Sequence, residues 1–330
     1  MSFTVRAGTV GAVTATADRT VGYEGSTGQA RVPWPIPFVL LAATWGCSFW
    51  FIKEGLRFLH PVQVAGVRCL LGALALLALS AATRVPLPRS ARTWGHLLVM
   101  SLLLNSVPLT LFAYGETRVS SILAAIINGA APLTTLLATV LILPGERLDA
   151  GRAIGLIIGF AGVLTVVRAW DGIGAGQGIG VLACVGAVCC YGLSFPYSRR
   201  FLHRPGDRPV ALATGQLVWA AVTLLPFAIA AGGTTGPVTA GPVLAMLALG
   251  VLGTGIAYVW NYRMIREIGP TAASTVTYLV PAFAVLVGVA FLHEPLTWNL
   301  PVGGVVLLVG VAAAQGRLRR PVRVAQPRSV

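Results

Sequence analysis

The sequence contains few charged residues: they make up 10% of its 330 positions, whereas hydrophobic residues make up 56%. Soluble domains usually carry about 25% charged residues. This scarcity excludes an ordinary soluble domain, because so much apolar surface could not be kept from water. Acidic residues are also missing from the centres of the long apolar runs. The chain therefore lacks an evident carboxylate relay of the kind that proton-driven carriers place inside the membrane.

Signatures of enzymes and of metal sites are missing as well. The chain has no HExxH, GxSxG or P-loop motif and no paired intramembrane aspartates, which argues against an enzyme and against an ATP-driven pump. Its five cysteines form no CxxC pair and lie in apolar runs, which argues against a disulfide framework and a zinc site. We therefore expect no catalytic residue, no metal and no cofactor.

What the chain does contain is a series of unbroken apolar runs of roughly 17–25 residues, each long enough to cross the bilayer core as a helix. The sequence predicts an all-α polytopic membrane protein with ten transmembrane helices. The expected spans are 36–53, 61–80, 95–115, 119–142, 152–168, 178–197, 209–231, 242–262, 270–292 and 298–316.

Basic residues outnumber acidic ones, 24 Lys and Arg against 10 Asp and Glu. They lie in short gaps between the spans and form no basic face with interleaved aromatics, so a nucleic-acid partner is not expected. If the N-terminus is cytoplasmic, nineteen of the 24 lie on the cytoplasmic side and four on the other, with Arg68 inside a span. Because cytoplasmic loops are enriched in Lys and Arg, we predict a plasma (inner) membrane protein with both termini cytoplasmic.

One stretch of the chain occurs twice, at residues 131–164 and 280–313. Each copy starts near a proline, reaches a lone glutamate, and has glycines nine and sixteen residues after it. The matched pairs are Pro132 and Pro281, Glu146 and Glu294, Gly155 and Gly303, and Gly162 and Gly310. Five spans per half is an odd number, so the second half enters the membrane in the opposite sense. The expected fold is two inverted five-helix repeats, which typically hold a substrate near the midplane.

Shorter matches support the duplication. Residues 45–49, WGCSF, correspond to 191–195, YGLSF, and Arg68 and Gln216 each lie seven residues after a proline. Together with the Pro, Glu and Gly pattern, these motifs resemble the EamA family of the drug/metabolite transporter superfamily. The resemblance implies that metabolites or drugs are carried, mostly outward, through a cavity lined by helices 1, 3, 4, 6, 8 and 9. The chain is then divided into a disordered cytoplasmic tail (1–34), a first EamA-like repeat (35–168), a linker (169–177), a second EamA-like repeat (178–316) and a basic cytoplasmic tail (317–330).

The candidate substrate-binding residues are polar or aromatic groups placed inside the spans. They are Trp45, Phe49, Arg68, Asn105, Asn128, Tyr191, Tyr258, Thr277 and Tyr278. Arg68 is the most informative, because a cation inside a bilayer costs at least about 2.5 kcal/mol. It either contacts an anionic group or gate partner, or it snorkels to the surface along its own stem. A lone membrane Asn more often makes an interhelical hydrogen bond than binds a ligand, and an aromatic-lined cavity suits amphipathic or cationic solutes.

Other residues are assigned structural roles. Pro132 and Pro281 are hypothesised to be hinges, because proline removes a backbone hydrogen bond from a helix. Small residues at four-residue spacing favour close packing of the spans at 119–142 and 152–168. The packing glycines are Gly151, Gly155, Gly159, Gly162, Gly303 and Gly310. Glu146 and Glu294 are interpreted as structural charges on opposite sides of the membrane.

We predict a secondary transporter that exports small organic metabolites or drugs by alternating access. Uptake or bidirectional exchange is the alternative within transport, and a receptor or a structural helix bundle is the alternative outside it. Coupling through an edge glutamate such as Glu54 or Glu116 stays open beside transport driven by the substrate gradient or the potential, which is slightly favoured. The expected partners are a small-molecule substrate and the lipid bilayer, and a homo-oligomer is not implied.

Overall fold

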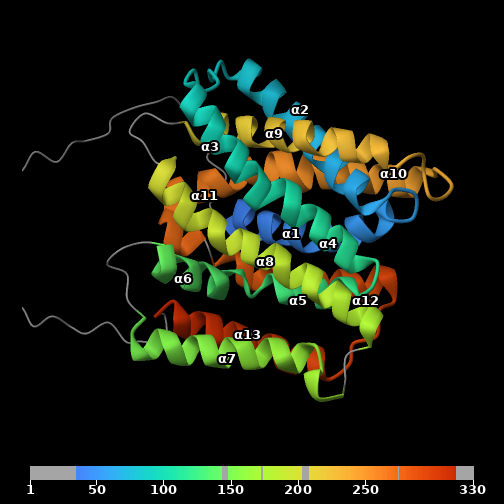
Figure 1. Ribbon diagram of the computed structural model, residues 1–330, viewed down its shortest axis with the longest axis vertical. Coiled ribbons are helices and arrows are strands. Elements are labelled where there is room, and N and C mark those ends of the chain that lie inside the picture. The colour runs from blue at the N-terminus through green and yellow to red at the C-terminus, as the bar shows by residue number, and fades with distance from the viewer. Residues whose placement is uncertain (1–34, 143–147, 172–173, 203–207, 274, 317–330) are drawn as a thin grey trace, which may run out of the picture. The chain divides into compact units, whose positions relative to one another are not determined.

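The computed structural model describes residues 35–142, 148–171, 174–202, 208–273 and 275–316. Within these ranges the regular structure is helical, without a strand (Figure 1). Seven of the described helices are long and apolar enough to cross a membrane, namely 35–55, 61–82, 91–116, 121–142, 176–201, 209–230 and 240–261. Three shorter apolar helices accompany them in the described ranges, at 150–166, 276–292 and 299–314. The expected all-α class is confirmed, while the tails at 1–34 and 317–330 lie outside the described residues.

Several of the long helices are divided into successive elements. In chain order they are α1 (Pro35–Gly55), α2 (Pro61–Ala82), α3 (Ala91–Ser101), η1 (Leu102–Ser106), α4 (Val107–Glu116), α5 (Ser121–Asn128), α6 (Ala131–Ile142), α7 (Ala150–Val166), η2 (Ala169–Asp171), α8 (Ala175–Phe201), α9 (Pro209–Ala230), α10 (Ala240–Leu247), η3 (Ala248–Ile256), α11 (Ala257–Ala273), α12 (Val276–Leu292) and α13 (Asn299–Ala314). The segments η1 and η3 are π-helical, and each lies in the third helix of its repeat.

Two stretches depart from the expected spans. The helix expected at 119–142 is interrupted at Gly129–Ala130, and Pro132, the second residue after the interruption, lacks the N–H that would continue the helix ladder. The helix expected to end at 262 continues as α11 to Ala273, and an ion pair between Arg263 and Glu267 spans one turn of this polar extension. Helix α12 therefore begins at Val276 instead of 270, and Pro281 lies inside it.

Helices at matched positions of the two repeats run antiparallel. Helix α2 packs against α9, with Ser80 opposite Thr214 at one end of the contact and Gln63 opposite Ala228 at the other. Helices α7 and α13 also lie side by side and run in opposite directions (Figure 1). This reversal of direction agrees with the inversion predicted from the odd number of spans per half.

The glycines of the WGCSF and YGLSF motifs allow each first helix to approach the fourth helix of the other repeat. A Cβ atom on Gly46 of α1 would lie 2.5 Å from the Cβ of Phe283 in α12. A Cβ atom on Gly192 of α8 would lie 2.6 Å from Oγ1 of Thr134 in α6. Real Cβ atoms do not approach other atoms so closely, so the two equivalent crossings require glycine.

The predicted packing glycines line the contact between α7 and α13. A Cβ atom on Gly155 would lie 2.2 Å from the Ala314 nitrogen, and one on Gly310 would lie 2.2 Å from the Gly159 nitrogen. The same seam includes Gly162 and Gly303, whereas Gly151 lies in the first turn of α7. The expected partner of α7 was the preceding span, and α6 does contact Gly159 through Leu133. The extensive contact of α7 is with α13, because the backbones of these two helices touch each other.

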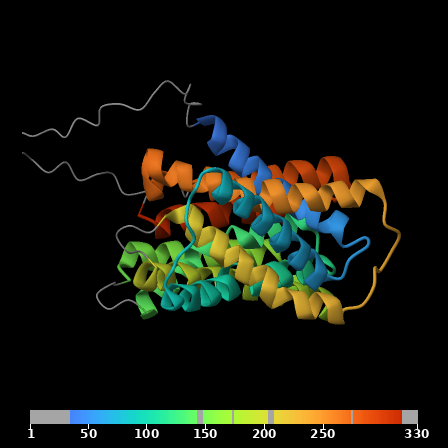
Figure 2. The same cartoon turned by 90° about the horizontal axis from the view of Figure 1, so that it is seen from above.

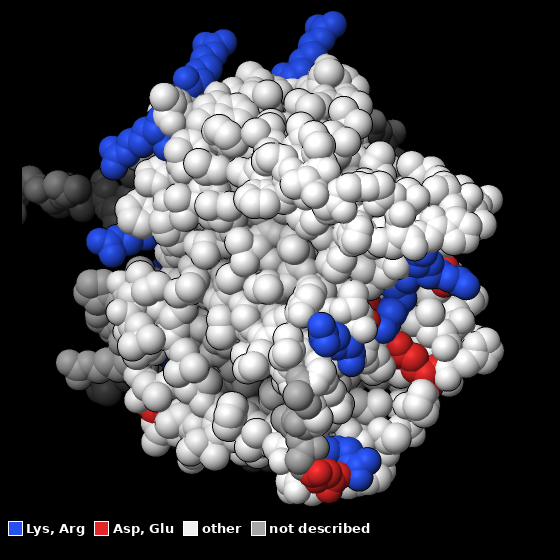
Figure 3. Space-filling view, turned by 45° about the vertical axis from the view of Figure 1, so that its right-hand side comes forward, with Lys and Arg blue, Asp and Glu red and all other residues white. Residues whose placement is uncertain are grey.

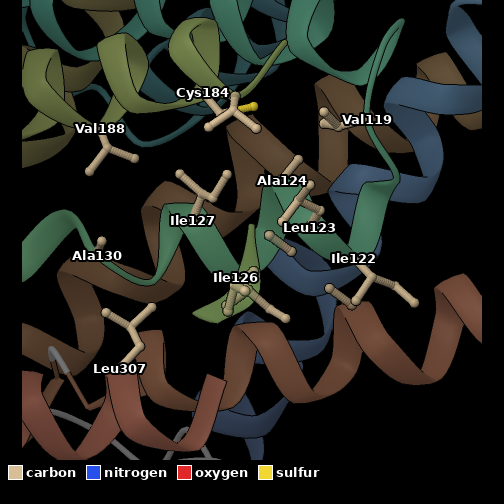
Figure 4. Packing of buried hydrophobic residues seen from close by; sticks show 14 of the residues in the cluster. Val119, Ile122, Leu123, Ala124, Ile126, Ile127, Ala130, Cys184, Val188 and Leu307 are labelled. Atoms are coloured by element: carbon tan, nitrogen blue, oxygen red, sulfur yellow. The ribbon is translucent and has the colours of Figure 1, made fainter. Parts of the chain in front are cut away.

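Helix α5 lies at the centre of the largest buried cluster, and every residue from Ser121 to Ile127 is buried. Figure 4 shows its side chains between Cys184 and Val188 of α8 and Leu307 of α13. Helix α1 crosses the orange helices of the second repeat obliquely (Figure 2) and contacts α10, α11 and α12. The face in Figure 3 is uncharged over most of its area, as expected of a surface that faces lipid tails.

Candidate functional site

Five polar side chains meet inside the bundle, and we call them the polar layer: Arg68, Asn105, Gln216, Thr254 and Tyr258. They come from α2, η1, α9, η3 and α11, so each repeat supplies part of the layer. Asn105, Gln216 and Thr254 are at most 6% exposed. Buried polar groups of this kind require partners, because an unpaired donor or acceptor away from water is costly.

The partners are supplied across the boundary between the repeats. Arg68 donates through Nε to Oγ1 of Thr254 at 2.8 Å and through Nη2 to the carbonyl oxygen of Gly253 at 3.5 Å. Gln216 donates through Nε2 to Oδ1 of Asn105. Each second helix thus reaches the π-helical segment of the other repeat's third helix, and we call these two contacts the crossed links.

The π-helical segments explain how the third helices present acceptors to their neighbours. In η3 the Thr254 hydroxyl donates to the Leu249 carbonyl at 3.1 Å, and its oxygen remains available to Arg68. In η1 Asn105 accepts from Gln216 and donates through Nδ2 to the Tyr258 hydroxyl at 3.0 Å. Segments of π-helix inside α-helices are frequent at functional sites. The third helix of each repeat contains one such segment, and both segments supply residues of the polar layer.

Three aromatic rings form a row beside the polar layer. Phe49 of α1 meets Phe112 of α4 edge to face, with ring centroids 5.9 Å apart, and Phe112 lies 5.9 Å from the ring of Tyr191 in α8. Trp45 packs against the same cluster. A Cβ atom on Gly253, whose carbonyl oxygen accepts from Arg68, would lie 3.1 Å from Oγ of Ser48, the neighbour of Phe49, so the aromatic row borders the polar layer.

The remaining candidates lie away from these contacts. Asn128 is the last residue of α5, directly before the interruption at Gly129. Thr277 and Tyr278 lie in the first turn of α12, and the Tyr278 hydroxyl donates to Oε1 of Gln315, just after α13, at 2.6 Å. The structure thus pairs Asn105 with Tyr258, links Arg68 to Thr254, and places Asn128, Thr277 and Tyr278 near helix ends.

The Glu294 carboxylate forms hydrogen bonds with residues of the first repeat. Its Oε1 accepts from the Ser121 backbone N–H at 2.7 Å, and its Oε2 accepts from the Ile122 N–H at 3.1 Å and the Ser121 hydroxyl at 3.0 Å. The carboxylate of the second repeat therefore caps α5 of the first, where the helix dipole favours negative charge. Its counterpart Glu146 lies outside the described residues.

Three residues that were not predicted from the sequence are buried in or near this site. Gln216 was recognised as the match to Arg68 but not as a site residue, and nothing in the local sequence distinguishes Thr254. Glu116 was placed at the edge of the membrane, yet it is fully buried. The burial of Glu116 depends on helices that are distant in the sequence, so the spacing of residues along the chain could not predict it.

Two surface hollows lie at another level, at the far end of α2 and beside the start of α9. They are lined by residues of 77–89 together with Arg208, Ala211 and Leu212. Asn105, Gln216 and Thr254 are buried and Arg68 and Tyr258 are half-buried, and none of the five lines either hollow.

Comparison with known proteins identifies relatives over most of the chain. The profile of the EamA-like transporter family matches residues 33–168 and 178–314, the two predicted repeats. An uncharacterized transporter of Archaeoglobus fulgidus is 30% identical over 289 residues, which cover 83% of this chain and 95% of that protein. Transporter YvbV of Bacillus subtilis, also uncharacterized, is 27% identical over 278 residues, 82% of this chain and 87% of its own.

A plant relative and a solved structure extend this picture. The chloroplastic WAT1-related protein At3g02690 of Arabidopsis thaliana is 25% identical over 283 residues, which cover 81% of this chain and 66% of that protein. A crystal structure with 21% sequence identity superposes with a TM-score of 0.62 and covers 88% of this chain and 100% of that chain. At this identity the likeness concerns the fold.

Proposed function

Because this chain belongs to the EamA-like transporter family, we propose that it is a secondary transporter that exports small organic metabolites or drugs by alternating access. In this proposal the seven long and three shorter apolar helices all cross the plasma membrane, as two inverted repeats with both termini in the cytoplasm. The end of the bundle at which α1 and α4 end then faces outward. We call it the Glu116 end.

The crossed links are the observation on which this proposal depends. They join the repeats through polar groups inside the bundle, the half-buried Arg68 with Thr254 and the buried Gln216 with Asn105. Rocking of one repeat against the other separates these partners, and a bound solute then replaces the lost hydrogen bonds. Groups that pair with each other in the closed state and with a solute in the open state are what a carrier needs at its midplane.

The chemistry of the layer favours a particular kind of solute. Arg68 and the two amides suit a carboxylate or carbonyl group, while the adjoining row of Phe49, Phe112 and Tyr191 suits an apolar or aromatic part. The guanidinium of Arg68 is directed to Thr254 of the facing helix, which supports a role within the bundle over snorkelling to the surface. We therefore propose small amphipathic organic solutes that carry a hydrogen-bond acceptor.

Untargeted metabolite profiling of the growth medium tests this function. Cells that overproduce the protein are compared with cells that overproduce Arg68→Ala, and with an Arg57→Ala control whose exposed side chain pairs with Glu54 at 3.0 Å. We expect one or a few solutes to accumulate outside with the parent protein and the control, and to fall at least tenfold with Arg68→Ala. Identical media from all three strains would contradict export through the polar layer.

Counterflow into proteoliposomes then separates a carrier from a receptor or a structural bundle. The purified protein is reconstituted with a high internal concentration of a solute found in the medium. A carrier takes up the labelled solute only when the unlabelled solute is present inside. Uptake that ignores the internal solute, or no uptake at all, would contradict secondary transport.

A further inference from the structure

Glu116, the last residue of α4, lies where a charged residue would be expected to face the membrane surface. Its neighbour Thr117 is exposed, yet Glu116 has no exposed surface. Neither oxygen of its carboxyl group has a hydrogen-bond partner among the described residues. A fully buried acidic group without a partner is rare in folded proteins, and it calls for a functional explanation.

The groups around Glu116 form their hydrogen bonds elsewhere. The Lys53 ammonium of α1 donates to the backbone oxygens of Glu116 at 2.5 Å and Val119 at 2.8 Å, not to the carboxyl group. Glu294 is engaged in capping α5, and Arg68 in the link to Thr254. Cys184 of α8, which packs against the neighbouring Gly115, is the remaining titratable group near Glu116 among the described residues. The carboxyl group is thus near two cations and one anion without pairing to any of them.

This arrangement fits the neutral form of the side chain. An ionised carboxylate removed from water needs hydrogen bonds or a direct ion pair, and Glu116 has neither. A protonated carboxyl group has no net charge to stabilise. In the conformation described here, burial without a partner therefore favours the protonated form of Glu116.

Close helix packing keeps water from the site. A Cβ atom on Gly115 would lie 2.5 Å from Sγ of Cys184 and 3.0 Å from the Gly180 carbonyl oxygen, so α4 and α8 are in direct contact beside Glu116. The Lys53 side chain closes the side toward α1, and the α5 N-terminus capped by Glu294 lies next to it. Water reaches the carboxyl group only when these elements separate.

We propose that Glu116 is a proton-binding site whose occupation is linked to closure of the Glu116 end of the bundle. This rests on the proposed alternating access and adds its ligand, the proton. When the end opens, the O–H bond breaks, the proton passes to water, and the carboxylate is hydrated beside Lys53. When the end closes, the proton returns from water. By linkage, the ratio of open to closed molecules rises by up to about tenfold per pH unit over the range in which only the open form releases the proton.

Infrared difference spectroscopy detects the proton directly and needs no substrate. The full-length protein is reconstituted in liposomes with ¹³C-labelled glutamate. We expect the carbonyl stretch of a protonated carboxyl group at neutral pH, shifted by the label, in the parent protein and in a Glu54→Gln control. Glu116→Gln removes the band, and Glu116→Asp removes its isotope shift. A parent spectrum without the band would overturn the proposal even if the variants failed to fold.

Labelling of native Cys184 reports opening of the same end. This thiol is fully buried, so a membrane-impermeant maleimide reaches it only after α4 and α8 separate. Modification is quantified by mass spectrometry at a series of pH values, and Glu116→Gln corrects for ionisation of the thiol itself. We expect the labelling rate of the parent and of Glu54→Gln to rise more steeply, by up to about tenfold per pH unit, than that of Glu116→Gln.

Equal pH dependence in the parent protein and Glu116→Gln would overturn the link between the proton and closure. Neither measurement depends on transport. If both succeed while counterflow fails, the proposed function is wrong and the proton site stands. If counterflow succeeds while the infrared band is missing, the proposed function stands and the proton site is wrong.

Discussion

Arg68 and Gln216 occupy equivalent positions in the two repeats, and each donates a hydrogen bond to the π-helical segment of the opposite repeat. The two contacts join equivalent helices, but they differ in charge, because one donor is a guanidinium and the other an amide. A motion that separates the repeats must break both. The strength of these two hydrogen bonds therefore contributes to the stability of the closed state.

A double-mutant cycle tests the neutral link. Asn105→Leu and Gln216→Leu each leave a buried polar partner unpaired, and we expect each to lower the free energy of unfolding by about 1–2 kcal/mol. The double variant loses less than the sum, by about 0.5 kcal/mol or more, because both partners are then removed. Thermal unfolding in detergent measures the change. Gln216→Leu combined with Arg57→Gln is the control, and strict additivity in both pairs would argue against the link.

The motif glycines give a prediction about helix crossings. Gly46→Ala and Gly192→Ala place a Cβ atom 2.5 Å from Phe283 and 2.6 Å from Thr134, so each should destabilise the protein by about 1–3 kcal/mol. Gly95→Ala in α3 is the matched control, because no atom lies within 4 Å of its added Cβ and alanine favours the helix. The melting temperature should fall for the first two and stay or rise for the third. Similar melting temperatures for all three would show that the crossings tolerate a side chain.

Spacing in the sequence was sufficient to predict the duplication, because Pro, Glu and Gly recur at fixed distances whatever the helices contact. It also predicted that Gly155, Gly159 and Gly310 serve packing. It did not predict the main partner of α7, which is α13 rather than the preceding helix. Partners that are distant in the chain depend on how the two repeats assemble, and a local stripe of small residues is compatible with either neighbour.

The polar layer was also only partly predictable from the sequence. Arg68 and Asn105 were recognisable because polar groups inside apolar runs are costly, and Gln216 was visible as a repeat match. The π-helical segments were not predictable, since residues such as LLLNS and GVLGT have no composition that distinguishes π from α-helix. Their partners across the interface stabilise that geometry, so it emerges only with the tertiary fold.

Gly310→Ala tests the backbone contact between α7 and α13. The added Cβ would lie 2.2 Å from the Gly159 nitrogen, which neither helix can avoid without separating, so we expect a loss of stability of about 3 kcal/mol or failure to fold. Gly304→Ala, on the same helix, meets its nearest atoms at 3.8 Å and should change stability by less than about 1 kcal/mol. The two variants are compared by thermal unfolding in detergent and by yield. Equal yields and melting temperatures would mean that the helices are less closely packed than described.

Glu294 offers the sharpest test of how the repeats are joined at the Glu116 end. Its carboxylate satisfies the N–H groups of Ser121 and Ile122, while the Ser120 hydroxyl accepts from Leu123, so the first turn of α5 has partners for all three donors. Glu294→Ala leaves two buried donors unpaired and should cost about 2–3 kcal/mol. Glu294→Gln keeps one acceptor and should cost roughly half as much.

The control is Glu267→Gln, whose ion pair with Arg263 lies at the surface and contributes at most about 1 kcal/mol. Because the cap belongs to one repeat and the helix to the other, hydrogen exchange at Ser121 and Ile122 should quicken in Glu294→Ala while the α7–α13 contact stays protected. Uniform faster exchange throughout the protein would instead mean that Glu294 stabilises the whole fold and has no particular role at this junction.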